Sequence, residues 1–98
     1  MNMREIQKMQ QKLLKMQEEL EQTIFTGTAG GGAVTITMNG KFEIVTVKID
    51  PEAFSPEEIA DLEVMVLAAA NDAQGKASEA QARLASNATG GLKVPGLF

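Results

Sequence analysis

The sequence from residue 33 to residue 50 reads AVTITMNGKFEIVTVKID and predicts a β-hairpin. In its first six residues apolar and polar side chains alternate, which is the period of a half-buried strand. Asn39-Gly40 favours a tight type I′ turn, because both central residues of that turn need positive φ angles. If Met38 then pairs with Lys41, one face of the hairpin carries the apolar side chains of Val34, Ile36, Val45, Val47 and Ile49.

A helix downstream of the hairpin can cover that face. Ser55 is a good N-cap, Pro56 suits the first helical position, and Glu58 completes a capping box. From there to Leu84 the apolar residues recur near heptad spacing. Residues 64–70 are apolar on more than one side, so this part of the helix needs burial nearly all round.

Residues 2–22 contain no Gly or Pro and predict a long N-terminal helix. Apolar residues spaced three and four apart form a coiled-coil-like seam of Ile6, Met9, Leu13, Met16 and Leu20. A separate edge of the helix is basic and carries Arg4, Lys8, Lys12 and Lys15. These cations lie toward the positive end of the helix dipole, which disfavours them, so stability alone does not explain their position.

Between this helix and the hairpin, residues 26–32 contain four glycines and predict an irregular segment. A phosphate-binding loop is one reading, but the run lacks G-x-G-x-x-G spacing and leads into a strand. The favoured reading is a hinge at Gly30, Gly31 and Gly32 that lets the first helix swing relative to the sheet.

The 98-residue chain, with 44% hydrophobic and 22% charged residues, has the size and composition of one globular domain. We expect this domain to span residues 1–86 and a flexible tail to span residues 87–98, because the last stretch is rich in Gly and contains Pro. The charged start is unlike a signal peptide, and no apolar run is long enough to cross a membrane. A soluble cytoplasmic protein is therefore expected.

The residue types present exclude much of enzyme chemistry. The chain has no Cys and no His, so disulfides, Cys/His zinc sites and imidazole catalysis are excluded. Residues 43–63 hold seven acidic residues against Lys48, which raises the alternative of a metal site or a hydrolase acting through Asp50 or Glu57. Their spacing fits no calcium loop, and several suit a helix N-terminus. We predict no enzyme activity, metal, cofactor or small-molecule substrate.

One hairpin with two helices is marginal as a monomer, and both helices are longer than the strands. A two-fold partner would bury the apolar surface, so the sequence predicts a homodimer with joined sheets and projecting helical arms. Asn71-Asp72 could be a site, but a polar pair in an apolar helix more often lies at an interface. The predicted interface lies on the second helix and comprises Leu62, Met65, Val66, Ala69, Ala70, Asn71 and Ala73.

The basic edge of the first helix has two readings. A net charge of −4 opposes nucleic-acid binding through overall charge, so binding would need a local patch. The edge can be a solvated face, or it can contact phosphates, and a dimer would present eight such cations. Because the predicted return strand has one Phe and the chain has no Tyr or Trp, base stacking is poorly supported and the backbone of double-stranded DNA is favoured.

Several motifs together resemble the YbaB/EbfC family of bacterial nucleoid-associated proteins. They are Gly27-x-Ala29-Gly30-Gly31-Gly32-x-Val34, Met38-Asn39-Gly40, Val47-x-Ile49-Asp50-Pro51, Leu62-Glu63, Ala69-Ala70-Asn71-Asp72-Ala73 and Gly90-Gly91 followed by Pro95-Gly96-Leu97-Phe98. The resemblance implies an α+β homodimer shaped like tweezers, which binds DNA through its helical arms and affects nucleoid organisation or gene expression. It implies a nucleoid location and no enzyme activity. The alternative is a scaffold whose arms and tail bind another protein.

Overall fold

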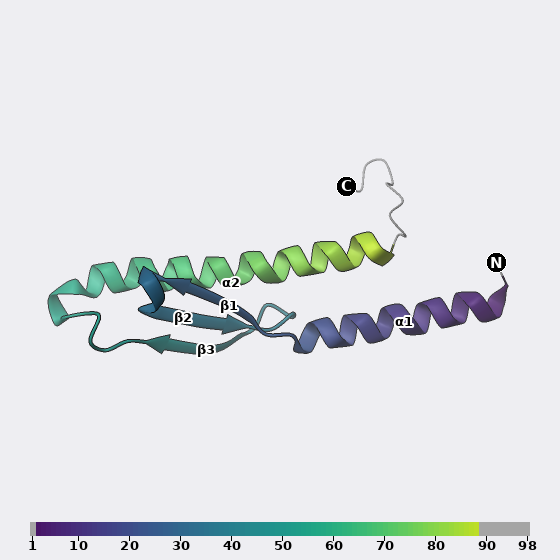
Figure 1. The fold of residues 1–98 in the computed structure, drawn as a ribbon, viewed down its shortest axis with the longest axis horizontal. Helices are drawn as coiled ribbons and strands as arrows, with labels where there is room; N and C mark the ends of the chain where they lie inside the picture. The colour runs from purple at the N-terminus through teal and green to yellow at the C-terminus, as the bar shows by residue number, and fades with distance from the viewer. Residues whose placement is uncertain (1, 89–98) are drawn as a thin grey trace.

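The computed structural model of the protein describes residues 2–88 and has an α+β fold (Figure 1). This confirms the predicted fold class of two long helices around a small antiparallel sheet. Short 3-10 turns lie at Gly30–Gly32 and Pro56–Glu58. The main elements are α1 (Met3–Gln22), β1 (Phe25–Ala29), β2 (Val34–Met38), β3 (Ile44–Ile49) and α2 (Ile59–Ala88).

Both helices begin at side-chain caps. Asn2 caps α1, and its Oδ1 accepts a hydrogen bond from the Glu5 N–H at 2.9 Å. The predicted capping box before α2 is confirmed, with the Ser55 hydroxyl donating to the Glu58 carboxylate at 2.8 Å. The first turn there is 3-10, and α2 continues to Ala88, two residues past the predicted end of the domain. Residues 89–98, most of the predicted tail, lie outside the described residues.

The sheet has three strands in the order β1-β2-β3, where the sequence indicated two. The prediction of an irregular segment over residues 26–32 is wrong for residues 26–29, because β1 pairs with β2 from Phe25 opposite Met38 onward. Gly27 disfavours a strand by its intrinsic propensity, yet it is the residue that makes β1 possible in this position. A Cβ atom at Gly27 would overlap the Ala69 carbonyl oxygen and lie 2.5 Å from the Ala73 nitrogen, so glycine lets β1 lie directly against α2.

The register of β2 and β3 differs from the predicted one, although the apolar face is the same. Val34 faces Ile49 rather than Val45, and Ile36 faces Val47. From Val34 to Thr37 the shift is four residues, an even number, so the side chains paired there stay on their predicted side of the sheet. At Met38, which faces Ile44 rather than Lys41, the shift is three residues, and a bulge between Thr37 and Met38 adds the fourth.

The prediction of a two-residue type I′ turn is wrong, because a longer turn over residues 39–43 connects β2 and β3. The Asn39 Oδ1 organises it by accepting from the Lys41 N–H at 2.9 Å and the Glu43 N–H at 3.1 Å. Within residues 2–88, Phe42 is the non-glycine residue with a positive φ, and Gly40 is not among the positive-φ glycines. Gly40 instead lies against the last turn of α1, where a Cβ atom would overlap the Leu20 carbonyl oxygen.

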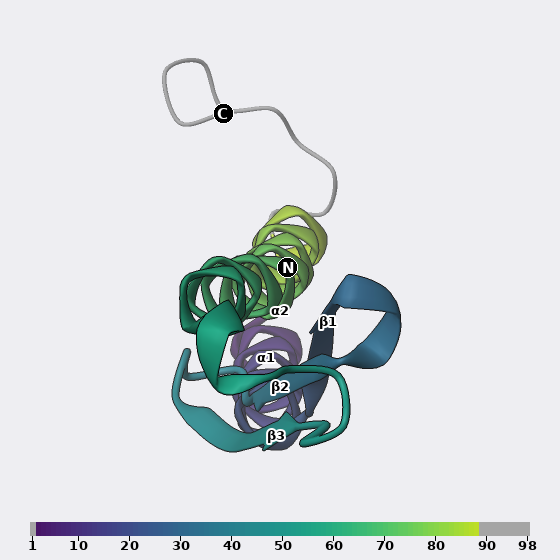
Figure 2. The ribbon, with the colours of Figure 1, turned by 90° about the vertical axis from the view of Figure 1, so that its left-hand side faces the viewer.

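The core lies between the sheet and α2. Val34, Ile36 and Met38 of β2 are buried against a row of small α2 residues, all at most 5% exposed, namely Ala69, Ala73 and Ala77. Viewed along the molecule, α2 lies beside β1 and β2 and leaves β3 on the far side (Figure 2). Four apolar side chains of β3 therefore stay 42–54% exposed: Ile44, Val45, Val47 and Ile49.

The two long helices extend past the same end of the sheet and give the molecule its elongated shape (Figure 1). Its extents are 65 × 27 × 16 Å. α1 runs toward the sheet and α2 runs away from it, so the helices are antiparallel. α2 makes far more of its contacts with the sheet than with α1, so α1 is an arm attached at its C-terminal end.

Candidate nucleic-acid interface

The four predicted phosphate-contacting residues lie together on α1 and are all exposed. At a spacing of four, four and three residues they form one stripe along the helix. Within residues 2–88, none of their side chains forms a hydrogen bond or an ion pair. With Glu5 as the one acid, residues 1–15 carry a net charge of +3 from Arg4, Lys8, Lys12 and Lys15.

The cations of α2 have a different environment. Arg83 forms an ion pair with Glu79 at 2.6 Å, one helical turn away. Lys76 lies 3.6 Å from the Asp72 carboxylate and also donates to the Thr26 carbonyl oxygen at 2.7 Å. Positive charge on α2 is thus balanced by acids of the same helix, whereas the charge on α1 is available for a ligand.

The apolar seam of α1 is covered along only part of its length. Leu13, Met16 and Leu20, near the sheet, are half-buried. Ile6 and Met9, farther out, are exposed. The outer half of α1 therefore presents both the basic stripe and uncovered apolar side chains.

The predicted dimer interface is divided between core and surface. Ala69 and Ala73 are fully buried against the strands of their own chain, so the structure differs here from the sequence prediction. The spacing showed that this side of α2 needs burial, but it could not show that the chain's own sheet provides it. Asn71 is exposed. The other four predicted interface residues are half-buried around the core: Leu62, Met65, Val66 and Ala70.

The predicted hinge glycines lie at the far end of the sheet. Gly30, Gly31 and Gly32 have φ angles of 64°, 67° and 95° and form the turn between β1 and β2. β1 separates them from α1, which joins the sheet through Thr23 and Ile24. A hinge function for the glycines stays a prediction.

Sequence reasoning missed how α2 covers one edge of the sheet. The outer edge of β1 offers its backbone groups to α2, where the Thr28 N–H donates to Asp72 Oδ2 at 3.1 Å and the Thr26 carbonyl accepts from Lys76. Asp72 thus acts within one chain, whereas the sequence favoured an interface role for the Asn71-Asp72 pair. The four-residue spacing of Asp72 and Lys76 signals only their pairing within α2, and no pattern in the sequence indicated that they contact β1. β3 is left as the uncovered edge.

Within residues 2–88, no group of three or more acidic side chains gathers into a potential metal site, including the acid-rich stretch 43–63. None of the helices described is long and apolar enough to cross a membrane.

Comparison with known proteins agrees with this architecture. The family model of the YbaB/EbfC DNA-binding family matches residues 1–92. The chain belongs to the YbaB/EbfC DNA-binding family. The resemblance found in the sequence motifs is thereby confirmed, and the family's description names DNA binding and no reaction.

Individual proteins are similar to this chain over most of its length. A nucleoid-associated protein of Pelotomaculum thermopropionicum is 48% identical over 96 residues, covering 98% of this chain and 91% of the relative. A nucleoid-associated protein of Dictyoglomus thermophilum is 48% identical over 97 residues, covering 98% of this chain and 93% of the relative. The crystal structure of an uncharacterised protein from Helicobacter pylori has a TM-score of 0.68 at 28% identity, covering 84% of this chain and 95% of that one.

Proposed function

We propose that this protein binds double-stranded DNA as a homodimer and that the outer part of α1 contacts the phosphates. The observation that carries the proposal is the stripe of exposed cations on α1, which has no acidic partner within residues 2–88. Phosphate contact by such cations releases condensed counterions, which is the main source of sequence-independent affinity for DNA. Membership of a DNA-binding family supports this reading.

The distribution of charge along the arm supports contact at its tip. The base of α1, next to the sheet, carries three acids, Glu18, Glu19 and Glu21, and residues 43–63 add a net −6 from seven acids and Lys48. DNA is therefore attracted to the outer part of α1 and repelled from the sheet. A total charge of −4 is compatible with binding because the acids and the cations lie in different places.

The exposed strand β3 supports a homodimer. Within residues 2–88 its edge is unpaired, and Val47 and Ile49 lie on the α2 side of the sheet without being covered by α2. The other edge, β1, is already occupied by Asp72 and Lys76, so the sheets of two copies would join through β3. The exposed Val64 and Leu67 of α2 are suited to cover the partner's β3. Such a dimer has two basic arms.

A dimer with two arms can contact one duplex at two places or bring two segments together. This would affect nucleoid organisation or gene expression and place the protein in the bacterial nucleoid, within the cytoplasm. The curated relatives described above carry the name nucleoid-associated protein, which supports this location.

The proposal is tested by removing charge from the arm. The double variant Lys8→Gln/Lys12→Gln removes four positive charges per dimer, and the slope of log affinity against log salt should fall by up to about 3.6 units for all duplex sequences. Gln keeps nearly the helix propensity of Lys, and neither residue lies on the apolar seam, so the fold should be unchanged. Duplex affinity measured from low to moderate salt gives the slope.

A matched control removes the same charge elsewhere. Lys41→Gln/Arg83→Gln also takes four positive charges from a dimer, but from exposed residues outside the α1 stripe. It should change the slope much less. Equal slopes for all three folded proteins would contradict phosphate contact by the stripe and favour the scaffold function, in which the arms bind another protein.

A further inference from the structure

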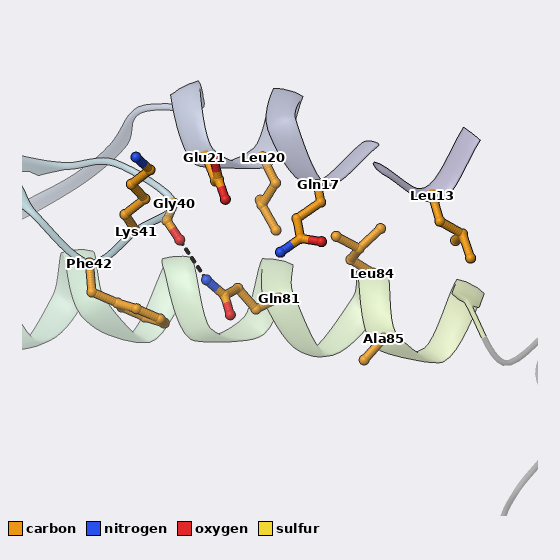
Figure 3. A pocket seen from close by; sticks show the side chains of 10 residues that line it. All are labelled: Leu13, Gln17, Leu20, Glu21, Gly40, Lys41, Phe42, Gln81, Leu84 and Ala85. Carbon is orange, nitrogen blue, oxygen red and sulfur yellow. Dashed lines mark hydrogen bonds between the residues drawn. The ribbon is translucent and has the colours of Figure 1, made fainter. Parts of the chain in front are cut away.

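A groove of about 450 Å³ lies between α1 and α2, where both helices leave the sheet (Figure 3). The turn over residues 39–43 closes its inner end through Gly40, Lys41 and Phe42. Side chains of α1 and α2 form the walls, among them Leu13, Leu20, Glu21, Gln81 and Leu84.

The walls of this groove are mainly apolar. Leu20 points from α1 toward α2, and Leu84 points from α2 toward α1 (Figure 3). Both are half-buried, as is Leu13, while Phe42 at the inner end is 42% exposed. The groove therefore presents apolar surface whose burial would be favourable.

Two charged side chains in the groove, those of Glu21 and Lys41, have no partner in the described part of the chain. The Glu21 carboxylate is half-buried, and among residues 2–88 nothing donates a hydrogen bond to it or pairs with it. Lys41 lines the same groove without forming an ion pair, and the Gln81 amide is engaged by the Gly40 carbonyl oxygen at 2.5 Å. A cation brought into the groove would be attracted to Glu21.

We propose that the groove is the docking site for residues 90–98 of the same chain. These residues read GGLKVPGLF, and their four large apolar side chains match the apolar walls. Lys93 stands among them and supplies the cation that suits Glu21. The occupied groove buries Leu92, Val94, Leu97 and Phe98.

The geometry brings this segment to the groove. α2 ends at Ala88, and the groove runs back along α2 from Ala85 to Gln81. Gln81 lies about 10 Å from Ala88 along the helix axis, because each residue rises 1.5 Å. Five further residues span up to about 17 Å when extended, so Lys93 reaches the level of Gln81. Gly90-Gly91 allows the chain to reverse its direction after the helix.

The covalent connection makes even a weak contact effective. A short tether gives the segment an effective concentration on the order of millimolar at the groove, so modest affinity is sufficient. Docking there adds contacts between α1 and α2, which touch each other much less than α2 touches the sheet. The docking requires neither DNA nor a second copy, so its test is independent of the proposed function.

Disulfide trapping tests the position of the segment, and the chain is suited to it because it contains no Cys. The full-length variant Lys93→Cys/Glu21→Cys should form a disulfide within one chain at least ten times faster than Lys93→Cys/Ala82→Cys. Ala82 is an equally reachable exposed residue of α2 that does not line the groove. Equal rates would overturn the proposal, since the tether alone would then explain both disulfides.

Mixing isotopically labelled and unlabelled protein shows whether the segment in the groove comes from the same chain or from a second copy. Disulfides confined to single chains support the proposal, whereas disulfides that join labelled to unlabelled chains would overturn it and assign the groove to a second copy. The double charge exchange Glu21→Lys/Lys93→Glu gives a further check on the ion pair. It should retain the docking that Lys93→Glu alone weakens.

Fluorescence gives a measurement that does not depend on cysteines. The chain has no Trp, so Phe98→Trp introduces a single reporter in the segment. Its emission should be blue-shifted in the otherwise unchanged protein, and Leu84→Lys should return it to the value of a solvated Trp. Leu14→Lys, at an exposed leucine of α1 that does not line the groove, should leave it unchanged. A solvated emission in the parent protein would overturn the proposal.

Discussion

The body of the molecule and its arm are held together in different ways. In the body, β1 packs on α2 through residues with little or no side chain, and Gly27 lies directly against the backbone of Ala69 and Ala73. The arm α1 meets the rest of the chain mainly at its last turn, where Leu20 lies over Gly40. The body therefore depends on close backbone contact, while the position of α1 depends on one turn and a few side chains.

Gly27→Val should have the largest effect, because it separates the two halves of the body. The new side chain would overlap α2 backbone atoms that cannot move without disrupting the helix. We expect the free energy of unfolding to fall by about 3 kcal/mol, at the upper end of overpacking effects. Urea denaturation followed by circular dichroism measures this loss.

The matched control is Gly75→Ala, in the same helix that Gly27 contacts. Nothing lies within 4 Å of a Cβ atom built at Gly75, so alanine should stabilise α2 by about 1 kcal/mol through its higher helix propensity. A small effect of Gly27→Val alongside this gain would mean that β1 does not pack on α2 as described.

The two edges of the sheet should respond differently to substitution, because α2 covers β1 and leaves β3 uncovered. On the uncovered strand, Val47→Lys should raise the dissociation constant of the proposed dimer at least 100-fold, or about 2.7 kcal/mol. On the edge occupied by α2, Thr26→Lys should change it little, because this exposed side chain lies away from the proposed interface. Light scattering across a dilution series measures both. Equal weakening by both variants would contradict joining through β3.

Gly40→Ala tests how the arm is held. A Cβ atom at residue 40 would lie 2.6 Å from the Leu20 carbonyl carbon, so the last turn of α1 must move away. We expect a loss of about 1–2 kcal/mol in the free energy of unfolding. Hydrogen exchange should show α1 amides losing protection while α2 amides opposite the sheet keep theirs. Uniform loss along both helices would mean that arm and body unfold together.

The sequence predicted the elements whose cause is local. The capping box at Ser55 and Glu58, the long helices and the apolar face of the hairpin all follow from short-range patterns, and the structure confirms them. Arg4, Lys8, Lys12 and Lys15 also share one exposed stripe, as helical spacing requires. Whether they contact DNA stays a prediction.

The features that the sequence did not predict depend on contacts between distant segments. β1 has a central glycine and little apolar alternation, and its pairing is explained by the close approach of α2, more than 40 residues later. Gly40 indicated a tight turn in the sequence. In the structure its lack of a side chain allows the backbone of α1 to come close, and the side chain of Asn39 organises the turn. A small residue in the sequence does not indicate which neighbour comes close to it.

The smallest expected effect is that of Arg83→Gln, which compares a paired cation of α2 with the unpaired cations of α1. Arg83 and Glu79 form an exposed ion pair, and such pairs contribute a few tenths of a kcal/mol, so thermal stability should hardly change. Because Glu79 already neutralises Arg83, the substitution should also alter duplex affinity less than Lys8→Gln does. A salt titration of both single variants measures the difference. If Arg83→Gln weakened binding as much as Lys8→Gln, the arm that contacts DNA would include α2, and ion pairing on that helix would not protect it from phosphate contact.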